Sequence, residues 1–557
     1  MGALTMKDLL AAALPLVMRK GIDSLTQGFQ LETVLWLAAG LVAISALKGL
    51  FQYWMRVIII GISRDIEYEM RNELFMRLIS LSTDFYARFR TGDIMARSTN
   101  DLNAVRMMLG PGIMYWTETS LTFVLSVAVM LYVDWPLTLA ALAPAPLVSF
   151  AVVYFGGKIH HRFEKIQKMF SDISSRVQEN FAGARLIRAY VQEEAEMEQF
   201  RKLNLEYIGQ NLRLIKTTGI FMPLLTALIA ITFLIVLWVG GARLLAGKIT
   251  IGSFVMFNTY MGMLIWPMIA MGWVVNLMQR GTASLSRIYE MLDQTPSIAP
   301  PANPRLLEAV RGEIEFRDVA VRYGEIAALE HVSFKIPAGS TVAVVGHTGC
   351  GKSSLMQLIP RLHDPQAGEV LLDGVNIKEY DPAAVRRHLG MVPQETFLFS
   401  ATIAENISFG VESATREDIV RASDIAGLKP DIESFPLGLD TVSGERGITL
   451  SGGQKQRTAI ARALLRDPKI LILDDALASV DTLTEERILR ELSLVMRGRT
   501  TILISHRVST VRHADCIYVL DHGHIVERGT HDQLLAAGGY YAGLHSKQLL
   551  EEELEAI

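Results

Sequence analysis

The first chemically informative residues are a glycine-rich loop followed by a lysine and two serines. The stretch VAVVGHTGCGKSS contains the pattern G-x-x-x-x-G-K-S at 346–353, between an apolar run and a helical stretch that begins near Lys352. This context is typical of a phosphate-binding loop, in which backbone N–H groups surround phosphates, the lysine adds charge and the serine hydroxyl binds Mg²⁺. The residues predicted to bind the nucleotide are Gly346, His347, Thr348, Gly349, Cys350, Gly351, Lys352, Ser353 and Ser354.

A carboxylate for the same metal ion is predicted at the end of a second apolar strand. KILILDD at 469–475 delivers Asp474, and a buried strand that ends in aspartate gains meaning downstream of a phosphate loop. The predicted metal ligands in these two motifs are Ser353 and Asp474. An active ATPase of this kind is expected to have glutamate after the metal aspartate, whereas this chain has Asp475.

A third motif, LSGGQKQR at 450–457, lies just before that strand. Ser451, Gly452 and Gly453 place a hydroxyl and backbone donors at a helix start, which is an anion site, and Gln454 follows them. One domain with two separate phosphate-binding elements indicates a nucleotide sandwiched between two copies of the domain.

These motifs occupy only the second half of a chain of 557 residues, which is too long for one compact core. Half of the residues are hydrophobic and the mean hydropathy is +0.28, with apolar residues concentrated before about residue 280. The net charge of −4 gives no indication of nucleic-acid binding. We expect the two cysteines, Cys350 and Cys516, to be free cytosolic thiols.

Several runs in the first half are long enough for a hydrocarbon core of about 30 Å, which takes about 20 helical residues. The runs are 33–62, 113–133, 135–157, 220–240 and 251–279. Glu118 and Lys48 interrupt two of them. Such residues either make a polar contact in a substrate path or lie near the membrane interface with a snorkelling side chain.

Basic residues concentrate in the connecting segments 62–112 and 158–216, which predicts that both are cytoplasmic helical extensions. The stretch 3–17 is short for a full crossing and contains Lys7 and Asp8. It lacks the features of a secretory signal. We expect the sequence to start inside the first membrane helix, with a partly inserted helix as the alternative.

Composition changes at the proline-rich stretch TPSIAPPANP, 295–304, and apolar strands then alternate with helices. The predicted fold is an all-α membrane domain at 1–285, with about six transmembrane helices and a truncated first helix. A linker at 286–312 joins it to an α/β P-loop ATPase domain at 313–548, and 549–557 form a tail.

The three motifs and the apolar first half resemble the ATP-binding cassette (ABC) transporters, specifically exporters in which one chain fuses membrane and ATPase domains as a half-transporter. The resemblance covers nearly the whole chain. It implies ATP and Mg²⁺ as cofactors, a second half-transporter as partner, contact with membrane lipids, no nucleic acid, and a multi-pass location in the cytoplasmic membrane. It also implies ATP hydrolysis coupled to transport, with coupling helices near 89–101 and 183–194.

Smaller family motifs can be assigned by the same resemblance. Tyr323 matches the aromatic residue that stacks on adenine, Gln394 the glutamine that contacts Mg²⁺, and His506 the switch histidine at the γ-phosphate. The stretch SGERG at 443–447 matches the segment beside the signature, and Asp481 matches the aspartate that links the two sites.

The run DDALASVD resembles one arm of heterodimeric bacterial multidrug exporters, in which one of two composite sites is weakened. In fully active cassettes a glutamate positions the attacking water, and Asp475 is one methylene shorter. The expected catalytic residues are Asp475, His506 and Gln394, with slow hydrolysis at this chain's own site. The alternative is a homodimer in which aspartate positions the water adequately.

Other classes fit less well. The uncharged spans argue against a soluble cassette ATPase, and the fused membrane domain argues against an importer ATPase. A lipid flippase or a peptide exporter stays open. Aromatic and methionine side chains suit hydrophobic or amphipathic substrates, but such residues also face lipid or pack in cores. The candidates are Trp116, Phe221, Met256, Met261, Trp266 and Trp273.

Overall fold

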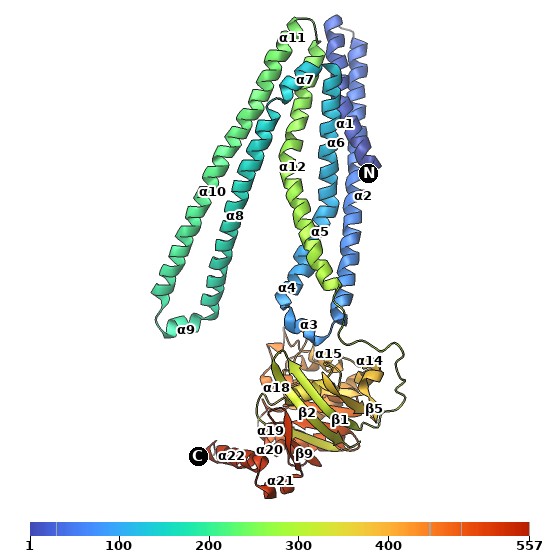
Figure 1. The fold of residues 1–557 in the computed structure, drawn as a ribbon, viewed down its shortest axis with the longest axis vertical. Helices are drawn as coiled ribbons and strands as arrows, with labels where there is room; N and C mark the ends of the chain where they lie inside the picture. Colours follow the sequence, from blue (N-terminus) through green and yellow to red (C-terminus); the bar gives the residue numbers. More distant parts are fainter. Residues whose placement is uncertain (29–30, 445–446, 481, 556–557) are drawn as a thin grey trace. The chain divides into compact units, whose positions relative to one another are not determined.

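The computed structural model describes residues 1–28, 31–444, 447–480 and 482–555, and it divides into two compact units (Figure 1). The membrane unit comprises Met1–Ile79 and Arg90–Gln294, and the α/β unit comprises Ser80–Phe89 and Thr295–Ile557. The chain therefore passes between the units at three places.

The membrane unit is helical throughout (Figure 1). Its elements are α1 (Gly2–Gln27), α2 (Leu31–Ser80), α4 (Thr91–Ala96), the π-helical turn η1 (Arg97–Asp101), α5 (Leu102–Met107), the π-helical turn η2 (Met108–Gly112), α6 (Ile113–Val133), α7 (Trp135–Leu142), α8 (Ala145–Ala182), α9 (Ala184–Ala189), α10 (Glu193–Ile235), the π-helical turn η3 (Val236–Gly240), α11 (Gly241–Leu245) and α12 (Ile251–Leu292).

Five helical stretches of the described residues are long and apolar enough to cross a membrane: Leu31–Ser80, Thr91–Val133, Trp135–Ala182, Glu193–Leu245 and Ile251–Leu292. Helix α1 is not among them, although it is a continuous helix of 26 residues that packs on α6 and α12; it carries the charged residues Lys7, Asp8, Arg19, Lys20 and Asp23.

Side-chain caps fix the turns between these helices. Asp134 accepts a hydrogen bond from the backbone N–H of Leu137 at the start of α7, and it also pairs with Arg243 at 2.6 Å. Thr250 caps α12 by accepting from the N–H of Ser253. These polar side chains satisfy backbone donors that a helix start leaves unpaired.

Three of the charged residues in the apolar stretches, Lys7, Asp8 and Glu118, lie close together. Lys7 lies 2.8 Å from Asp8 and 2.5 Å from Glu118 of α6, and Lys7 and Asp8 are 3% and 2% exposed. Of the candidate substrate contacts, Met256 and Met261 belong to the hydrophobic core of the unit.

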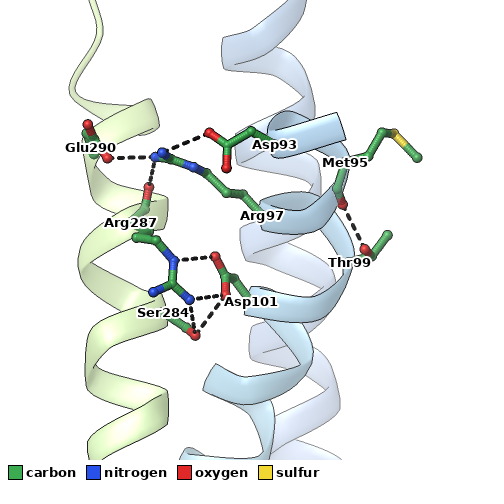
Figure 2. A network of polar contacts seen from close by, with 8 residues as sticks. All are labelled: Asp93, Met95, Arg97, Thr99, Asp101, Ser284, Arg287 and Glu290. Atoms are coloured by element: carbon green, nitrogen blue, oxygen red, sulfur yellow. Dashed lines mark hydrogen bonds and ion pairs between the residues drawn. The ribbon is translucent and has the colours of Figure 1, made fainter. Parts of the chain in front are cut away.

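A second polar cluster joins η1 to the last turns of α12 (Figure 2). Asp101 accepts from Ser284 at 2.9 Å and from the Arg287 guanidinium at 2.9 and 2.5 Å. Arg97 donates to the Arg287 carbonyl at 2.9 Å and to Glu290 at 2.7 Å. Arg97 and Asp101 are four residues apart, so both reach α12 from one face of the turn. We call this set the η1–α12 network.

The α/β unit contains two sheets. The strands are β1 (Ile314–Tyr323), β2 (Ile326–Ile336), β3 (Thr341–Val345), β4 (Ala367–Leu372), β5 (Val375–Asn376), β6 (Leu389–Val392), β7 (Ile470–Asp474), β8 (Thr500–Ile504), β9 (Cys516–Asp521) and β10 (His524–Gly529). One sheet has the order β2-β1-β4-β5 and is antiparallel; the other has the order β10-β9-β3-β8-β7-β6.

In the larger sheet β6, β7, β8, β3 and β9 run parallel, and β10 adds an antiparallel edge. Strands β7 and β8 are fully buried, as expected for a sheet covered on both faces. The carboxyl ends of β3, β7 and β8 meet at one edge, where ligands bind in such sheets.

The helices of the α/β unit are α3 (Thr83–Arg88), α13 (Lys352–Leu358), α14 (Pro382–Arg387), α15 (Ile403–Ser408), α16 (Arg416–Ile425), α17 (Lys429–Ser434), α18 (Gly452–Leu465), α19 (Thr482–Met496), α20 (Val508–Val511), α21 (His531–Ala537) and α22 (Tyr540–Glu555). The short 3₁₀ turns are η4 (Ile377–Glu379) and η5 (Gly438–Asp440).

Helix α3 lies just before the range 89–101, in which the resemblance places a coupling helix. The segment between α2 and α4 that belongs to the α/β unit is Ser80–Phe89, whereas most of the expected range 89–101 forms α4 and η1 of the membrane unit. The polar contacts of α3 are the reason, because the Thr83 hydroxyl donates to the Leu362 carbonyl at 2.9 Å and Asp84 lies 2.8 Å from His363 Nδ1. Helix α9 falls within the second expected range, 183–194.

Candidate functional site

The phosphate loop joins β3 to α13, as the sequence predicts. Gly346 and Gly351 have φ angles of +156° and +106°, and a Cβ atom would lie 2.1 Å from the Leu520 carbonyl oxygen at the first position and 2.3 Å from the Ala328 carbonyl oxygen at the second. Only glycine fits at these places. The two glycines therefore let the loop pack closely against neighbouring backbone.

Lys352 begins α13 and is 5% exposed. Its ammonium group donates to the carbonyl oxygens of Gly346 at 2.9 Å and His347 at 2.8 Å, so the side chain folds over the loop. A positive charge held there meets the oxygens of any phosphate that enters. Thr348 and Gly349 are exposed at the tip of the loop, and Ser353 and Ser354 follow in the first turn of α13.

Cys350 lies under the loop. Its Sγ atom is 3.8 Å from the Lys352 ammonium, and burial raises the pKa of the thiol despite that positive charge. His347, on the opposite side, contacts Tyr540 edge-to-face with ring centroids 5.1 Å apart.

Asp474 ends β7 and is 3% exposed. Burial raises the pKa of its carboxyl, while a hydrogen bond from Ser353 and the charge of Lys352 act in the other direction. Its Oδ1 atom is buried and has no hydrogen-bond partner among the described residues. A buried carboxylate oxygen beside a serine hydroxyl fits Mg²⁺, which binds through one or two protein oxygens plus phosphates and waters.

Asp475 turns away from the strand axis with φ +44° and is 6% exposed. Its backbone N–H donates to the Ile504 carbonyl at 2.9 Å, which fixes the turn to the end of β8. One carboxylate oxygen accepts from the His506 backbone N–H at 3.2 Å, and the other lies 3.2 Å from His506 Nε2. The structure thus brings together Lys352, Ser353, Asp474, Asp475 and His506.

The signature stretch forms the start of α18. Ser451 is the N-cap and makes a capping box with Gln454, at 3.3 Å and 2.8 Å. The Gln454 amide continues to Asp431 of α17 at 2.9 Å. Gly452 and Gly453 lie against Ser479, and a Cβ atom at 453 would be 2.9 Å from the Ser479 carbonyl. The cap leaves an ordered, exposed helix N-terminus, which suits an anion.

The smaller motifs are placed around this site. Tyr323 ends β1 and is 42% exposed. Gln394 is exposed two positions after β6, whose Val392 pairs with Leu473 of β7, so it lies at the same sheet edge as Asp474. Ser443 is fully buried and donates to the Phe399 carbonyl at 2.7 Å. Glu445, Arg446 and Asp481 lie outside the described residues.

One residue of the site had no predicted role. The Gln456 amide donates to the Asp475 carbonyl at 3.3 Å and accepts from the Ser479 N–H at 2.8 Å. Gln456 thereby connects the signature helix to the turn that carries Asp475. It lies within the LSGGQKQR stretch, but only the fold shows which way it points.

Comparison with known proteins identifies the family of the chain. Residues 1–268 match the family described as ABC transporter transmembrane region, and residues 329–478 match the family described as ABC transporter. The chain is 37% identical to the probable multidrug resistance ABC transporter ATP-binding/permease protein YheI of Bacillus subtilis (strain 168), over 96% of this chain and 92% of that protein.

It is also 33% identical to the ATP-dependent lipid A-core flippase of Syntrophus aciditrophicus (strain SB), over 98% of this chain and 91% of that protein. Among solved structures, a bacterial Atm1-family ABC exporter with ATP bound has a TM-score of 0.79 at 28% identity, covering 98% of this chain and 97% of that chain.

The apolar helices and these relatives show that the chain is a multi-pass protein of the cytoplasmic membrane. Its nucleotide-binding domain lies in the cytoplasm. Its ATPase domain binds ATP and couples hydrolysis to transport. The chain belongs to the ABC transporter family, as an exporter half in which the membrane and ATPase domains are fused.

Proposed function

We propose that this chain is one half of a dimeric exporter of hydrophobic or amphipathic compounds and that its own ATP site hydrolyses slowly. The observation that carries the proposal is the geometry of Asp475. A shortened carboxylate follows the metal aspartate, and both of its oxygens are engaged by His506 at 3.2 Å.

In the proposed site the loop 346–351 and Lys352 hold the phosphates, and Tyr323 stacks on the base. Ser353, Asp474 and Gln394 hold Mg²⁺, which supplies charge neutralisation at the β- and γ-phosphates. Asp475 orients the attacking water and His506 contacts the γ-phosphate. The orphaned Oδ1 of Asp474, beside the Ser353 hydroxyl, supports the assignment of the metal ligands.

The slow rate follows from the length of the Asp475 side chain. An aspartate carboxylate is withdrawn by roughly an ångström relative to glutamate, and a misplacement of that size can cost about a hundredfold in rate. ATP binding depends on the loop 346–351, Lys352 and Asp474, and all of these match the pattern of fully active cassettes. We therefore expect tight binding of ATP with slow turnover.

The signature residues Ser451, Gly452, Gly453 and Gln454 then contact the nucleotide of the partner half. If the partner carries glutamate at the position of Asp475, its ATP is hydrolysed at the normal rate, with this chain supplying the signature. The proposed assembly is a heterodimer with one slow and one fast site.

The substrate class rests on the membrane unit and on two relatives. An apolar cavity of about 320 Å³ is lined by Ile113, Trp116, Val275, Met278 and Gln279. One relative is named as a multidrug resistance transporter and another as a lipid A-core flippase. The second name favours an alternative function, a homodimeric lipid flippase, and peptide export stays a further alternative.

The deciding experiment is steady-state ATP hydrolysis by the purified chain alone in lipid, together with ATP binding. Tight binding with little hydrolysis supports the slow-site proposal. Rapid hydrolysis that is abolished by His506→Ala shows a competent homodimer and overturns it. In the first case, co-purification with a partner half that carries glutamate at the position of Asp475 should restore hydrolysis.

A further inference from the structure

A cavity of about 510 Å³ lies against Tyr323 in the α/β unit. Its lining includes His363, Asp84 of α3 and Ser297 from the segment after α12, besides Tyr323 itself. The volume lies in the range of roughly 300–1,000 Å³ that is usual for small-molecule sites. This inference rests on the proposed function, in which Tyr323 stacks on the nucleotide base. The cavity is then the part of the nucleotide site that holds the base.

His363 is the residue that connects the parts of this lining. Its ring contacts Tyr323 edge-to-face, with centroids 5.7 Å apart and an interplanar angle of 88°. Its Nδ1 atom is 2.8 Å from Asp84 Oδ1. Its Nε2 atom is 3.2 Å from the Thr83 hydroxyl. Because both nitrogens contact α3, the ring cannot rotate without losing at least one of these contacts.

The loop that carries His363 is itself held firmly. Arg361 pairs with Asp364 at 2.9 Å, and Arg386 donates to the carbonyl oxygens of Pro360 and Arg361 at 2.7 Å each. This loop directly follows α13, which begins at Lys352 of the phosphate loop. His363 and the phosphate loop therefore belong to one short, stiff segment of the chain.

Helix α3 is anchored to the same place by further contacts. The Thr83 hydroxyl donates to the Leu362 carbonyl at 2.9 Å. The Ser82 and Ser297 hydroxyls are 2.5 Å apart, and Ser297 donates to Asp84 at 3.4 Å. A movement of His363 would therefore shift the first turn of α3.

We propose that His363 is a positioning residue, which orients Tyr323 for the nucleotide base and transmits base binding to α3 through Asp84 and Thr83. Tyr323 is partly exposed, and the edge-to-face contact leaves at least one face of its ring open to the base. When a base stacks there, the ring and His363 move as a pair. The Asp84 and Thr83 contacts carry that movement to α3.

Two substitutions test separately the support of Tyr323 by His363 and the transmission from His363 to α3. His363→Gln removes the ring that supports Tyr323, whereas His363→Phe keeps an aromatic edge but removes both nitrogens. We expect His363→Gln to weaken Mg-ATP binding about two- to tenfold, from the usual strength of an aromatic pair. We expect His363→Phe to bind Mg-ATP close to the wild-type affinity, because the contact with Tyr323 remains.

Inorganic tripolyphosphate is the control ligand, since it fills the phosphate loop but has no base. Its affinity for the full-length chain in lipid should be the same in wild type and in both variants. The ratio of ATP to tripolyphosphate affinity should therefore fall in His363→Gln alone. A ratio unchanged in His363→Gln would overturn the positioning role, and equal losses for both ligands would show damage to the loop instead.

Transmission to α3 is tested by amide hydrogen exchange of Ser80–Phe89. We expect ATP, but not tripolyphosphate, to slow exchange there in wild type. His363→Phe, Asp84→Asn and Thr83→Val should each reduce this effect while ATP still binds. Protection that persists in all three variants would refute transmission through these contacts. Fast hydrolysis by the lone chain would overturn the slow-site proposal without affecting either measurement.

Discussion

Asp475 and His506 meet at two points, because one carboxylate oxygen accepts the His506 backbone N–H and the other faces the imidazole Nε2, each at 3.2 Å. The contact joins the turn after β7 to the end of β8. It also uses both oxygens of a carboxylate that is 6% exposed. Asp475 thus holds His506 in place, and any water that Asp475 orients must compete with this contact.

Asp475→Glu tests whether this geometry limits turnover. The added methylene lets a carboxylate reach farther into the nucleotide site, so we expect ATP hydrolysis by the assembled transporter to rise by about ten- to a hundredfold at this site. Single-turnover hydrolysis with the partner's site inactivated is the measurement. Asp475→Asn is the matched control, with no gain expected, and an unchanged rate in Asp475→Glu would mean that Asp475 is not limiting.

Cys350 reports on the phosphate loop. A bulky maleimide at this thiol should block nucleotide binding, and ATP should protect the thiol. Because burial raises the pKa of Cys350, little thiolate exists at neutral pH, and the labelling rate should increase as the pH rises toward the pKa. Cys516→Ser leaves Cys350 as the single thiol for the assay. Labelling without loss of ATP binding would contradict the placement of the loop.

Asp474 makes a prediction about stability and pH. Its pKa is raised in the folded chain, so the folded state binds a proton more readily than the unfolded state, and stability without nucleotide falls as the pH rises from 3.8 through the raised value. Asp474→Asn should therefore raise the apparent melting temperature at pH 7 by about 2–4 °C and remove the stabilisation by Mg-ATP.

The control for Asp474 is Asp467→Asn, because the Asp467 side chain is 84% exposed. It should change neither the melting temperature nor its response to Mg-ATP. A lower melting temperature for nucleotide-free Asp474→Asn would show that the carboxylate stabilises the fold, contrary to the buried, half-satisfied environment described above.

The η1–α12 network gives a prediction for the membrane unit. Asp101→Asn removes the charge that three donors of Ser284 and Arg287 share, and the loss should cost about 1–3 kcal/mol of stability. Charge exchange by Asp101→Arg with Arg287→Asp should recover part of it. Arg201→Ala, in a pair whose side chains are 74% and 52% exposed, should stay within about 0.5 kcal/mol. Equal melting temperatures for Asp101→Asn and wild type in detergent would contradict a structural role.

Close packing beside this network is tested by a pair of glycines on α12. A Cβ atom at Gly281 would lie 2.3 Å from Met108 Cβ, whereas nothing lies within 4 Å of one at Gly262. Gly281→Ala should cost about 1–3 kcal/mol through overpacking, and Gly262→Ala should be neutral or slightly stabilising. Thermal unfolding of the two variants in the same detergent compares them directly, and equal effects would show that α12 can move away from η2.

The parts of the site that sequence could predict are those in which a short stretch carries both the residue and its structural context. The phosphate loop with its strand and helix, Asp474 at the end of a buried strand, and the Ser451–Gln454 cap are all of this kind. The meeting of β3, β7 and β8 at one edge follows from the general rule that parallel strands have their carboxyl ends on the same side of the sheet, whereas the strand order is known only from the structure.

Contacts between distant segments could not be predicted in this way. The pairing of Lys7 with Glu118, of Asp101 with Arg287 and of Asp84 with His363 each joins helices or loops far apart in the chain. A single sequence gives the charge of each residue but does not show which residue contacts it in the folded protein. The same limitation applies to α3, because the helical pattern that runs from α2 into η1 does not reveal that Thr83 and Asp84 contact Leu362 and His363.

The placement of Ser80–Phe89 has a consequence for the modularity of this chain. The compact α/β unit is discontinuous in sequence, since α3 lies within the residues that match the transmembrane family. A single proteolytic or genetic cut after Gln294 would release a fragment without α3 and would expose the surface around Leu362 and His363 to water. An exchange of this unit between related transporters would therefore have to transfer Ser80–Phe89 together with the residues after Gln294. Otherwise the new unit would contact an α3 whose side chains match a different surface.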